Sequence, residues 1–444
     1  MSSKDTIFAV ASGGGRAGVT ILRISGPQSD AALAAMLTGA LPAPRRTSLR
    51  TIVNPQTGGA MDQALILRFK APASFTGEDM VELHVHGSPA VVEAVSAALF
   101  SLGLRQARAG EFTRRAFENA RMDLTEAEGL ADLIDSETEA QRAQAFRQMS
   151  GGLKNVYNEW REAILDALAA VEGEIDFPDE EDVPDKLALR AGSGLDDLAL
   201  ALEKSLAGSR AGERVRHGLD IVVIGPPNAG KSSVINALSK KEAAIVSDEA
   251  GTTRDIVEVN LVIGGLPVRL SDTAGLRDTE NKIEAEGVRR ARVRAQDADL
   301  RIGVLDSSDL SELAAIEAVL RPGDILLLNK SDVNAANVSR ETIDVMALSA
   351  HNAEDIERLR GKLEVIISDR FKVQENAGLT RARHRHCAQA CLDAVLRARL
   401  NLDAAPELAG EDLRAALHAI KELAGEADIE AVLDRIFSRF CIGK

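Results

Sequence analysis

The sequence predicts a multidomain protein of the α+β and α/β classes, with helical segments on both sides of the α/β part. Residues 1–118 alternate strand-like runs rich in Val, Ile and Thr with two helical patterns. The stretch 124–177 and the chain from about 380 carry apolar residues at helical spacing. Between these segments, an apolar run, a Gly-rich turn and a helical pattern follow one another over 219–238, the order found in α/β folds.

The composition is that of a soluble globular protein. Its 444 residues suffice for about two to four domains, and 45% of them are hydrophobic. No apolar run is long enough to span a bilayer, and the N-terminus lacks the layout of a signal peptide. Three cysteines make no disulfide framework, so we expect a reducing cytoplasm and no membrane partner. The net charge of −15 disfavours non-specific nucleic-acid binding, so any such contact must be local or shared with a partner.

The first unit is predicted to be a mixed sheet with two helices. Strands are expected at 5–11, 18–25, 64–69 and 80–86, and helices at 29–37 and 89–102. The glycine-rich stretch Gly13–Gly18 resembles a nucleotide-binding loop, but it joins two strands instead of opening a helix. A plain flexible turn is therefore the better interpretation of that stretch.

The segment before the α/β part is predicted to be mainly long helices. Glycine is almost absent over 124–177 until Gly151 and Gly152, where we expect a break. The acidic run 177–184 is expected to be a solvated loop, because it lacks metal-ligand spacing. A helix is expected over 187–209, followed by a short polar link over 212–217.

The C-terminal segment is again predicted to be helical, at 380–402, 408–423 and 429–440. The basic cluster 381–386 has two open interpretations, a solvated helix start or a local contact with RNA. Cys387 and Cys391 lie four residues apart, which favours burial in a helical core over a zinc site.

The α/β part begins with a phosphate-binding loop, Gly-Pro-Pro-Asn-Ala-Gly-Lys-Ser at 225–232. An apolar strand precedes this loop and a helical pattern follows it, which is the context that a P-loop requires. Its backbone N–H groups and the start of the helix together attract phosphate. Lys231 is expected to reach the β- and γ-phosphates of a nucleotide, and the Ser232 hydroxyl to bind Mg²⁺.

Four further motifs complete a guanine-nucleotide set: 251–255, 272–275, 329–332 and 349–350. Thr253 is expected to complete the Mg²⁺ shell and Asp272 to hold Mg²⁺ through water, while the Gly275 N–H senses the γ-phosphate. Five motifs in this order, each at a strand end, predict a GTPase.

The last two motifs predict how guanine is selected. The Asp332 carboxylate can accept two N–H bonds from the guanine edge, where adenine offers a mismatch. Asn329 and Lys330 are expected to brace this loop, and the Ala350 N–H to cover guanine O6. Leu276 stands where small signalling GTPases place a glutamine that orients water, so another group must do this.

The whole chain resembles the MnmE (TrmE) family of tRNA uridine modification GTPases. The resemblance rests on Asn228 in the P-loop, Gly-Thr-Thr-Arg-Asp at 251–255 and the terminal Cys-Ile-Gly-Lys. Leu-Arg-Ile-Ser-Gly at 22–26 and Phe-Thr-Gly-Glu-Asp at 75–79 also match the N-terminal domain of that family.

The resemblance implies four segments in three domains. These are an N-terminal folate-binding and dimerisation domain (1–118), a discontinuous helical domain (119–215 and 373–444) and an inserted Ras-like G domain (216–372). It also implies a homodimer that acts with an FAD-containing partner, MnmG, in a heterotetramer or larger complex. The reaction of the family adds an aminomethyl or carboxymethylaminomethyl group to carbon 5 of the wobble uridine of certain tRNAs.

The resemblance also implies the site residues. The folate contacts, for a 5-formyl or methylene tetrahydrofolate, fall on Arg23, Glu82, Arg121 (where Lys is usual) and Lys444. The K⁺ contacts fall on Asn228, Ser247 (where Thr is usual), Glu249 and Thr252, and the catalytic residue of GTP hydrolysis on Glu284. Because the resemblance places Lys444 at the folate, we expect Cys441 within reach of the one-carbon group, with a catalytic role in tRNA modification; a small buried hydrophobe is the alternative. The residues expected to bind GTP are Asn228, Ala229, Gly230, Lys231, Ser232, Ser233, Ser247, Asp248, Glu249, Ala250, Gly251, Thr252, Thr253, Asp272, Thr273, Ala274, Gly275, Asn329, Lys330, Asp332, Ser349 and Ala350.

Two other functions stay open at this point. An Era-like ribosome-assembly GTPase shares the nucleotide motifs but has no reason for the folate residues or the terminal cysteine. A scaffold whose GTP cycle only switches partners is the third possibility. Analysis of tRNA nucleosides from cells that lack the protein distinguishes the first function from the second.

Overall fold

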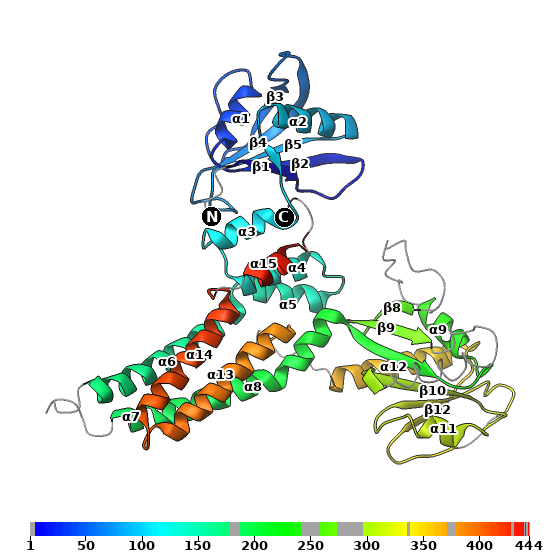
Figure 1. Cartoon of the computed structure of the whole chain (residues 1–444). Coiled ribbons are helices and arrows are strands. Elements are labelled where there is room, and N and C mark those ends of the chain that lie inside the picture. The colour runs from blue at the N-terminus through cyan, green and yellow to red at the C-terminus, as the bar shows by residue number, and fades with distance from the viewer. Residues whose placement is uncertain are drawn as a thin grey trace, which may run out of the picture. The chain divides into compact units, whose positions relative to one another are not determined.

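The fold is described from a computed structural model, which covers residues 5–176, 187–240, 258–272, 296–334, 338–370, 378–427, 430–438, 440 and 443 (Figure 1). The chain divides into two compact units, and each is described by itself. Unit 1 comprises Met1–Ala131, Gln148–Leu189 and Leu400–Lys444, and unit 2 comprises Asp132–Arg147 and Arg190–Arg399.

Unit 1 begins with a six-stranded sheet in the order β3-β4-β5-β2-β1-β6. Neighbouring strands are antiparallel except β1 and β6, so the expected mixed sheet is confirmed. The elements are β1 (Ile7–Val10), β2 (Ala17–Ser25), α1 (Ser29–Ala35), β3 (Ser48–Val53), β4 (Ala60–Phe69), β5 (Met80–Gly87), α2 (Pro89–Ser101), β6 (Arg105–Gln106) and α3 (Glu111–Glu118).

The core of this sheet follows from alternation along its strands. Leu22 and Ile24 on β2 and Leu83 on β5 are fully buried, and they pack with Leu33 of α1 and Leu99 of α2. The sequence did not predict β3, because this edge strand buries only one of its six side chains. The turn joining β1 and β2 is confirmed.

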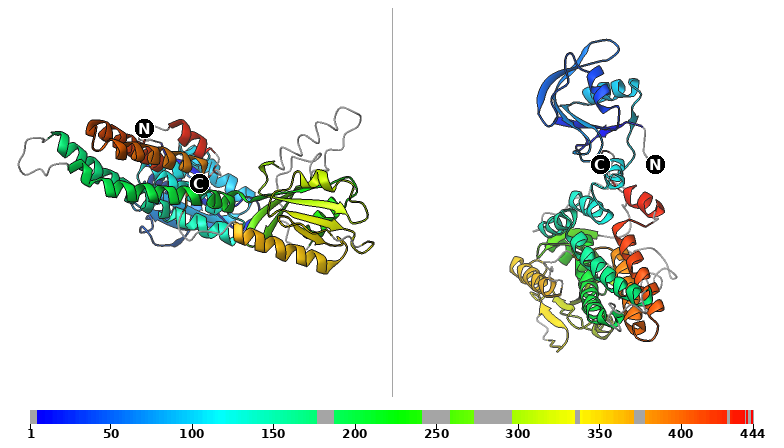
Figure 2. Two further views of the ribbon diagram at one scale, coloured as in Figure 1. Left: turned by 90° about the horizontal axis from the view of Figure 1, so that it is seen from below. Right: turned by 90° about the vertical axis from the view of Figure 1, so that its left-hand side faces the viewer.

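Helices complete unit 1, and two of them lie side by side along most of their length (Figures 1 and 2). These are α6 (Gly152–Asp176) and α14 (Pro406–Ala424), which are joined by an ion pair between Arg414 and Glu172. The remaining helices are α4 (Leu124–Ile134), α7 (Leu187–Arg190) and α15 (Glu430–Phe437). Unit 1 thus contains helices from both ends of the chain.

Two expectations about the helices were wrong. The helical run before Gly151 is interrupted at 135–138, because Thr138 opens α5 (Glu139–Met149) with a capping box. The Thr138 hydroxyl accepts from the Gln141 N–H at 3.3 Å, and the Gln141 side chain accepts from the Thr138 N–H at 3.1 Å. The expected polar link 212–217 is the last part of α8 (Gly192–His217), which ends only at Gly218 with a φ of 83°.

Unit 2 contains a second six-stranded sheet, in the order β12-β11-β10-β7-β9-β8. Only β8 is antiparallel to its neighbour. Helix α12 lies along one face of this sheet (Figure 2). Apolar side chains of α9 and α12 pack together against that face. The elements are β7 (Leu219–Ile224), α9 (Lys231–Ser239), β8 (Glu258–Ile263), β9 (Leu266–Asp272), β10 (Leu300–Asp306), α11 (Leu313–Glu317), β11 (Ile325–Asn329), β12 (Asp344–Ala347) and α12 (Ala353–Arg370).

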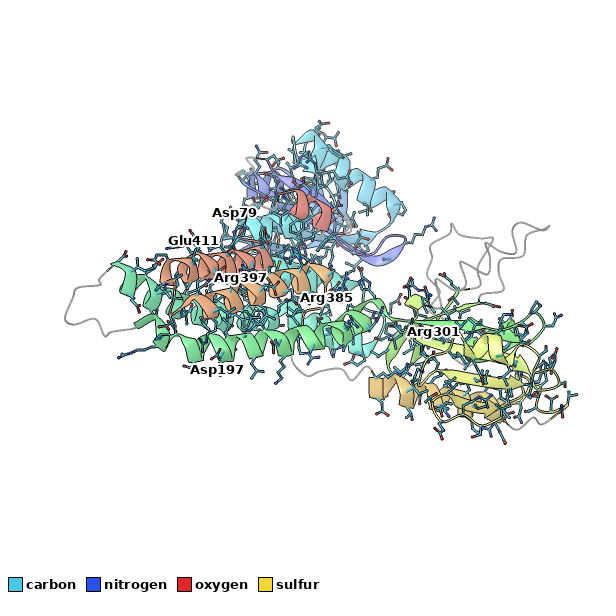
Figure 3. All side chains as sticks on the ribbon, turned by 60° about the horizontal axis from the view of Figure 1, so that its bottom comes forward. Asp79, Asp197, Arg301, Arg385, Arg397 and Glu411 are labelled. Atoms are coloured by element: carbon cyan, nitrogen blue, oxygen red, sulfur yellow. The ribbon has the colours of Figure 1, made fainter. Side chains whose placement is uncertain are left out.

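The basic cluster at the start of α13 (Ala382–Asn401) is partly used inside unit 2. Arg381 forms an ion pair with Asp132 at 2.7 Å, and Arg385, labelled in Figure 3, pairs with Glu213. Arg381 is therefore neither a solvated side chain nor free for RNA. Cys387 and Cys391 are 3% and 0% exposed, which confirms that they face a helical core.

The described helices include none that is both long and apolar enough to cross a membrane.

Candidate functional site

The P-loop lies where β7 turns into α9, at the carboxyl edge of the parallel strands. Two positions of this loop must be glycine, because neighbouring atoms approach their Cα atoms too closely for a side chain. A Cβ on Gly225 would lie 2.2 Å from the Val304 carbonyl oxygen, and one on Gly230 would lie 2.1 Å from Asn329 Nδ2. The two glycines therefore let the P-loop approach the backbone of β10 and the Asn329 side chain at the end of β11.

Lys231 lies in the first turn of α9 and is 5% exposed. Its Nζ donates to the carbonyl oxygens of Gly225 and Pro226, at 2.9 and 3.0 Å. Burial lowers the pKa of Lys231, and the Asp272 carboxylate opposes this effect. The ammonium group is thus held over the loop, where a phosphate can take the place of these carbonyl groups.

The two described residues expected at Mg²⁺ lie together. The Ser232 hydroxyl donates to Asp272 Oδ2 at 2.8 Å, and Asp272 is 4% exposed at the end of β9. A hydroxyl and a carboxylate side by side are oxygen ligands of the kind that Mg²⁺ prefers. Ser233 follows on the exposed side of α9.

Asn329, at the end of β11, connects three loops. Its Nδ2 donates to the Ala229 carbonyl oxygen of the P-loop at 2.8 Å. Its Oδ1 accepts from the Ala350 N–H at 3.1 Å. Asn329 is 2% exposed, so these bonds form in a low-dielectric interior and fix the loops firmly.

The loop after Asn329 presents Asp332 to solvent. Lys330 takes a left-handed φ of 60°, and its Nζ donates to Asp306 at 2.7 Å, which lowers the pKa of that carboxyl group. Asp332 is exposed and makes no hydrogen bond or ion pair with the described residues. Its carboxylate is therefore available to a ligand.

Two supporting acids were not predicted. Asp355 accepts from the Ser349 N–H at 2.8 Å and so fixes the last motif, and Asp306 holds Lys330. Asp306 ends β10, and Asp355 is in the first turn of α12. Asp306 could have been predicted as a site residue from its position at the end of a strand, as Asp272 was.

Thirteen expected site residues lie outside the described residues. They are Ser247, Asp248, Glu249, Ala250, Gly251, Thr252, Thr253, Thr273, Ala274, Gly275, Glu284, Cys441 and Lys444.

A second polar site lies on the sheet of unit 1. Arg23 on β2 and Glu82 on β5 face each other in the register, and Arg23 donates to Glu82 Oε1 from Nε and Nη2, at 3.1 and 2.9 Å. The guanidinium also lies over the rings of Phe75 and Phe112, 5.3 and 5.7 Å from their centroids. His84 Nε2 lies 3.4 Å from the other Glu82 oxygen. This half-buried pair can bind a flat polar ring.

The loop that carries Phe75 is held by residues that were not predicted. Arg115 is 2% exposed and donates to Glu78 and to Asp5, at 3.0 and 2.9 Å. Arg121 lies beside the same loop, because a Cβ on Gly77 would lie 3.2 Å from Arg121 Cγ. Arg121 makes no hydrogen bond or ion pair with Arg23 or Glu82.

Phe437 of α15 and Gly443 pack against the first part of unit 1. Phe437 is buried at 3% exposure, and a Cβ on Gly110 would lie 2.4 Å from its carbonyl oxygen. A Cβ on Gly443 would lie 2.0 Å from the Val10 carbonyl oxygen. Val10 follows Ala9, which pairs with Arg23, so the penultimate residue of the chain lies beside the strand next to this site.

Two protein-family models together match nearly the whole chain. Residues 6–121 match the family model described as "GTP-binding protein TrmE N-terminus", and residues 124–441 match "MnmE helical domain". Among solved structures, the G domain of the T. maritima FeoB iron transporter covers 33% of the chain at 26% identity, with a TM-score of 0.26, too low to argue from.

Two relatives match over all or nearly all of their length. The "tRNA modification GTPase MnmE" of Maricaulis maris is 52% identical over 439 residues, covering 99% of both chains. The human mitochondrial "5-taurinomethyluridine-[tRNA] synthase subunit GTPB3" is 46% identical over 462 residues, covering 99% of this chain and 93% of that protein. The first of the three predicted functions is thereby favoured over the Era-like one. This chain belongs to the MnmE family of tRNA modification GTPases.

Proposed function

We propose that this chain hydrolyses GTP to drive modification of carbon 5 of the wobble uridine of certain tRNAs, together with an FAD-containing, MnmG-like partner. The observation that carries the proposal is the pair of sites in one chain. One site has the loops of a guanine-nucleotide pocket joined by Asn329. The other has the Arg23–Glu82 pair, with Gly443 packed against the neighbouring strand β1.

At the nucleotide site, Lys231 takes the β- and γ-phosphates and Asp332 reads the guanine edge. The Ser232 hydroxyl and Asp272, 2.8 Å apart, fit a Mg²⁺ shell that Thr253 completes. When bound, Mg²⁺ neutralises charge on the phosphates.

Hydrolysis is proposed to need K⁺ and pairing of two G domains. Asn228 is exposed at a φ of 60°, and its side chain makes no hydrogen bond with the described residues, so its amide oxygen is available to a cation. Ser247, Glu249 and Thr252 are the other proposed contacts. Glu284 orients the attacking water in place of the glutamine that Leu276 replaces.

The site of unit 1 is proposed to bind a tetrahydrofolate derivative in its 5-formyl or methylene form, through Arg23, Glu82, Arg121 and Lys444. The chemistry of the site fits this group. Glu82 is half-buried and can accept N–H bonds from the amidine-like edge of a pterin. Two aromatic rings beside the pair supply flat apolar surface.

Cys441 is proposed to act in tRNA modification and not in GTP hydrolysis. Gly443 lies beside β1, which supports a position of Cys441 near the folate site. The ammonium group of Lys444 favours the thiolate, which is the reactive form. Replacement Cys441→Ser should leave the GTPase rate unchanged while modification falls.

We propose the domain limits that the sequence predicts, which are 1–118, 119–215, 216–372 and 373–444. We propose a homodimer that joins the flavoprotein in a heterotetramer or larger complex.

Nucleoside analysis of tRNA from cells that lack this chain tests the proposal. We expect loss of the carbon-5 modification at the wobble uridine. A normal nucleoside profile together with a defect in ribosome assembly would contradict it and would favour the Era-like function.

A further inference from the structure

The acidic charge of this chain is unevenly distributed. The net charge is −15, and 68 of the 444 residues are Asp or Glu. Yet the 31 residues from 31 to 61 contain no Asp or Glu, and they include Arg45, Arg46 and Arg50. These three arginines lie on the loop before β3 and on β3 itself.

The three arginines are exposed and carry unneutralised charge. They form no ion pair with any residue in the described part of the chain. Arg45 Nη2 donates to the Ala73 carbonyl oxygen at 3.0 Å, and Arg50 Nη1 donates to the Leu49 carbonyl oxygen at 3.1 Å. Both partners are neutral, so the full positive charge of each guanidinium faces solvent.

The backbone that displays these side chains is held in place by other groups. Arg45 takes a left-handed φ of 59°, which is costly for a residue with a Cβ. Its N–H donates to the Arg68 carbonyl oxygen at 2.8 Å, and the buried Arg68 guanidinium bonds Asp30 and the Pro42 carbonyl oxygen. Arg68 thus fixes the backbone of the loop that carries Arg45, so this backbone loses little entropy when a ligand binds.

Protection of the sheet edge accounts for only part of this arrangement. β3 is an edge strand, and a charged side chain on an edge strand prevents pairing with other chains. Arg50 lies on β3 and can serve this purpose. Arg45 and Arg46 precede the strand, so edge protection gives no reason for them or for the strained backbone at Arg45.

We propose that Arg45, Arg46 and Arg50 form a phosphate-binding surface for the backbone of tRNA. Guanidinium groups bind phosphate through two parallel hydrogen bonds, and such contacts position a nucleic acid without reading its bases. An acidic chain repels a polyanion as a whole, so a segment that displays three unpaired arginines and contains no acid is a place where contact costs least. This inference rests on the proposed function, because it takes tRNA as the polyanion.

The test is binding of total tRNA, isolated from cells lacking the protein, to the full-length chain at several KCl concentrations. The variant is Arg45→Gln, Arg46→Gln and Arg50→Gln together. The matched control is Arg190→Gln, Lys204→Gln and Arg210→Gln, which removes the same charge from exposed positions on α7 and α8. We expect the first variant to bind about tenfold more weakly near 0.1 M salt. The slope of log affinity against log salt should fall by about 2 to 3.

The control should bind tRNA like the unaltered chain, and both variants should hydrolyse GTP at the normal rate. Equal affinity and equal salt slope in the first variant and the control would overturn the surface, as would absence of tRNA binding by the unaltered chain at low salt. Either result leaves the proposed modification reaction untouched, because nucleoside analysis of cells lacking the chain tests that separately.

Discussion

The nucleotide site of unit 2 and the Arg23–Glu82 site of unit 1 are built in opposite ways. In unit 2, each described functional side chain lies at or just after the carboxyl end of a parallel strand, so consecutive loops meet at one edge of the sheet. In unit 1, Arg23 and Glu82 project from the middle of two antiparallel strands and face each other across the sheet. A strand-end site depends on loops, whereas a sheet-face site depends on register.

This difference predicts that the two sites fail independently. The described loops of the nucleotide site are tied to one another by Asn329, and the rings and carboxylate around Arg23 come from unit 1 alone. A substitution at one site should therefore abolish its own ligand binding and leave the other ligand bound. Coupling between the two sites should therefore be detectable only in the tRNA modification reaction, which needs both ligands.

The largest expected effect is on GTP hydrolysis. Glu284→Ala should slow turnover by about 100-fold or more, because a group that orients the attacking water is lost. The unaltered chain should turn over faster in K⁺ than in Na⁺, and folate binding should be the same in both salts. Steady-state phosphate release checks both points. Equal rates in K⁺ and Na⁺ would rule out the proposed cation site.

Guanine selection should depend on Asp332 with an effect of about 2–4 kcal/mol in GTP affinity. Asp332→Asn exchanges an acceptor for a donor opposite the guanine N–H edge, so xanthine nucleotide should bind this variant better. Titration with fluorescent GTP and XTP measures the change. Normal GTP affinity in the variant would mean that another residue reads the base.

At the sheet-face site, Arg23→Gln should weaken binding of 5-formyltetrahydrofolate by roughly 10- to 100-fold. The loss has two parts. One is the guanidinium charge over two aromatic rings, and the other is the Glu82 carboxylate left without its Arg23 partner. Arg16→Gln, on the exposed β1–β2 turn, is the matched control. Calorimetric titration reports the affinity, and the GTPase rate should not change in either variant.

The smallest effect concerns cysteine reactivity. Burial raises the pKa of Cys391 to about 12, so its thiol stays protonated in the folded chain. Alkylation at about pH 8 should label Cys441 and spare Cys387 and Cys391. Because the unfolded thiol ionises near 9.0, the stabilising contribution of Cys391 is complete below that pH and falls as pH rises toward 12. Mass spectrometry of the labelled peptides checks the pattern, and rapid labelling of Cys391 in the folded chain would contradict its burial.

How much the sequence could predict follows the same division. The described nucleotide residues were found because a strand end, a Gly-rich turn and a helix start are local signals, and Lys231, Asp272 and Asn329 lie at such positions. The Arg23–Glu82 pair has no local signal, because 59 residues separate its members and only strand register brings them together. Resemblance to a family supplied those residues.

The roles of residues that act through buried contacts could not be predicted from the sequence. Arg115 looks like an ordinary charged residue in an amphipathic helix, yet it is 2% exposed and holds the loop of Phe75 through Glu78.

Two helix boundaries were missed although the sequence contains signals for them. Thr138 and Gln141 form a capping box that marks the break before α5, but the continuous apolar spacing led us to expect one helix there. The continuation of α8 to His217 was missed because charged residues in a last helical turn resemble a polar link.

The central claim is that tRNA modification needs both sites of this chain. Its most direct test is mass spectrometry of wobble-uridine nucleosides from cells in which the only copy of the gene for this protein carries Asp332→Asn or Arg23→Gln. We predict that both variants lose the carbon-5 modification, although Arg23→Gln hydrolyses GTP at the normal rate in vitro. Arg16→Gln should keep the normal nucleoside profile. Normal modification in the Arg23→Gln strain would contradict the claim that tRNA modification needs the site on the sheet of unit 1 as well as the nucleotide site.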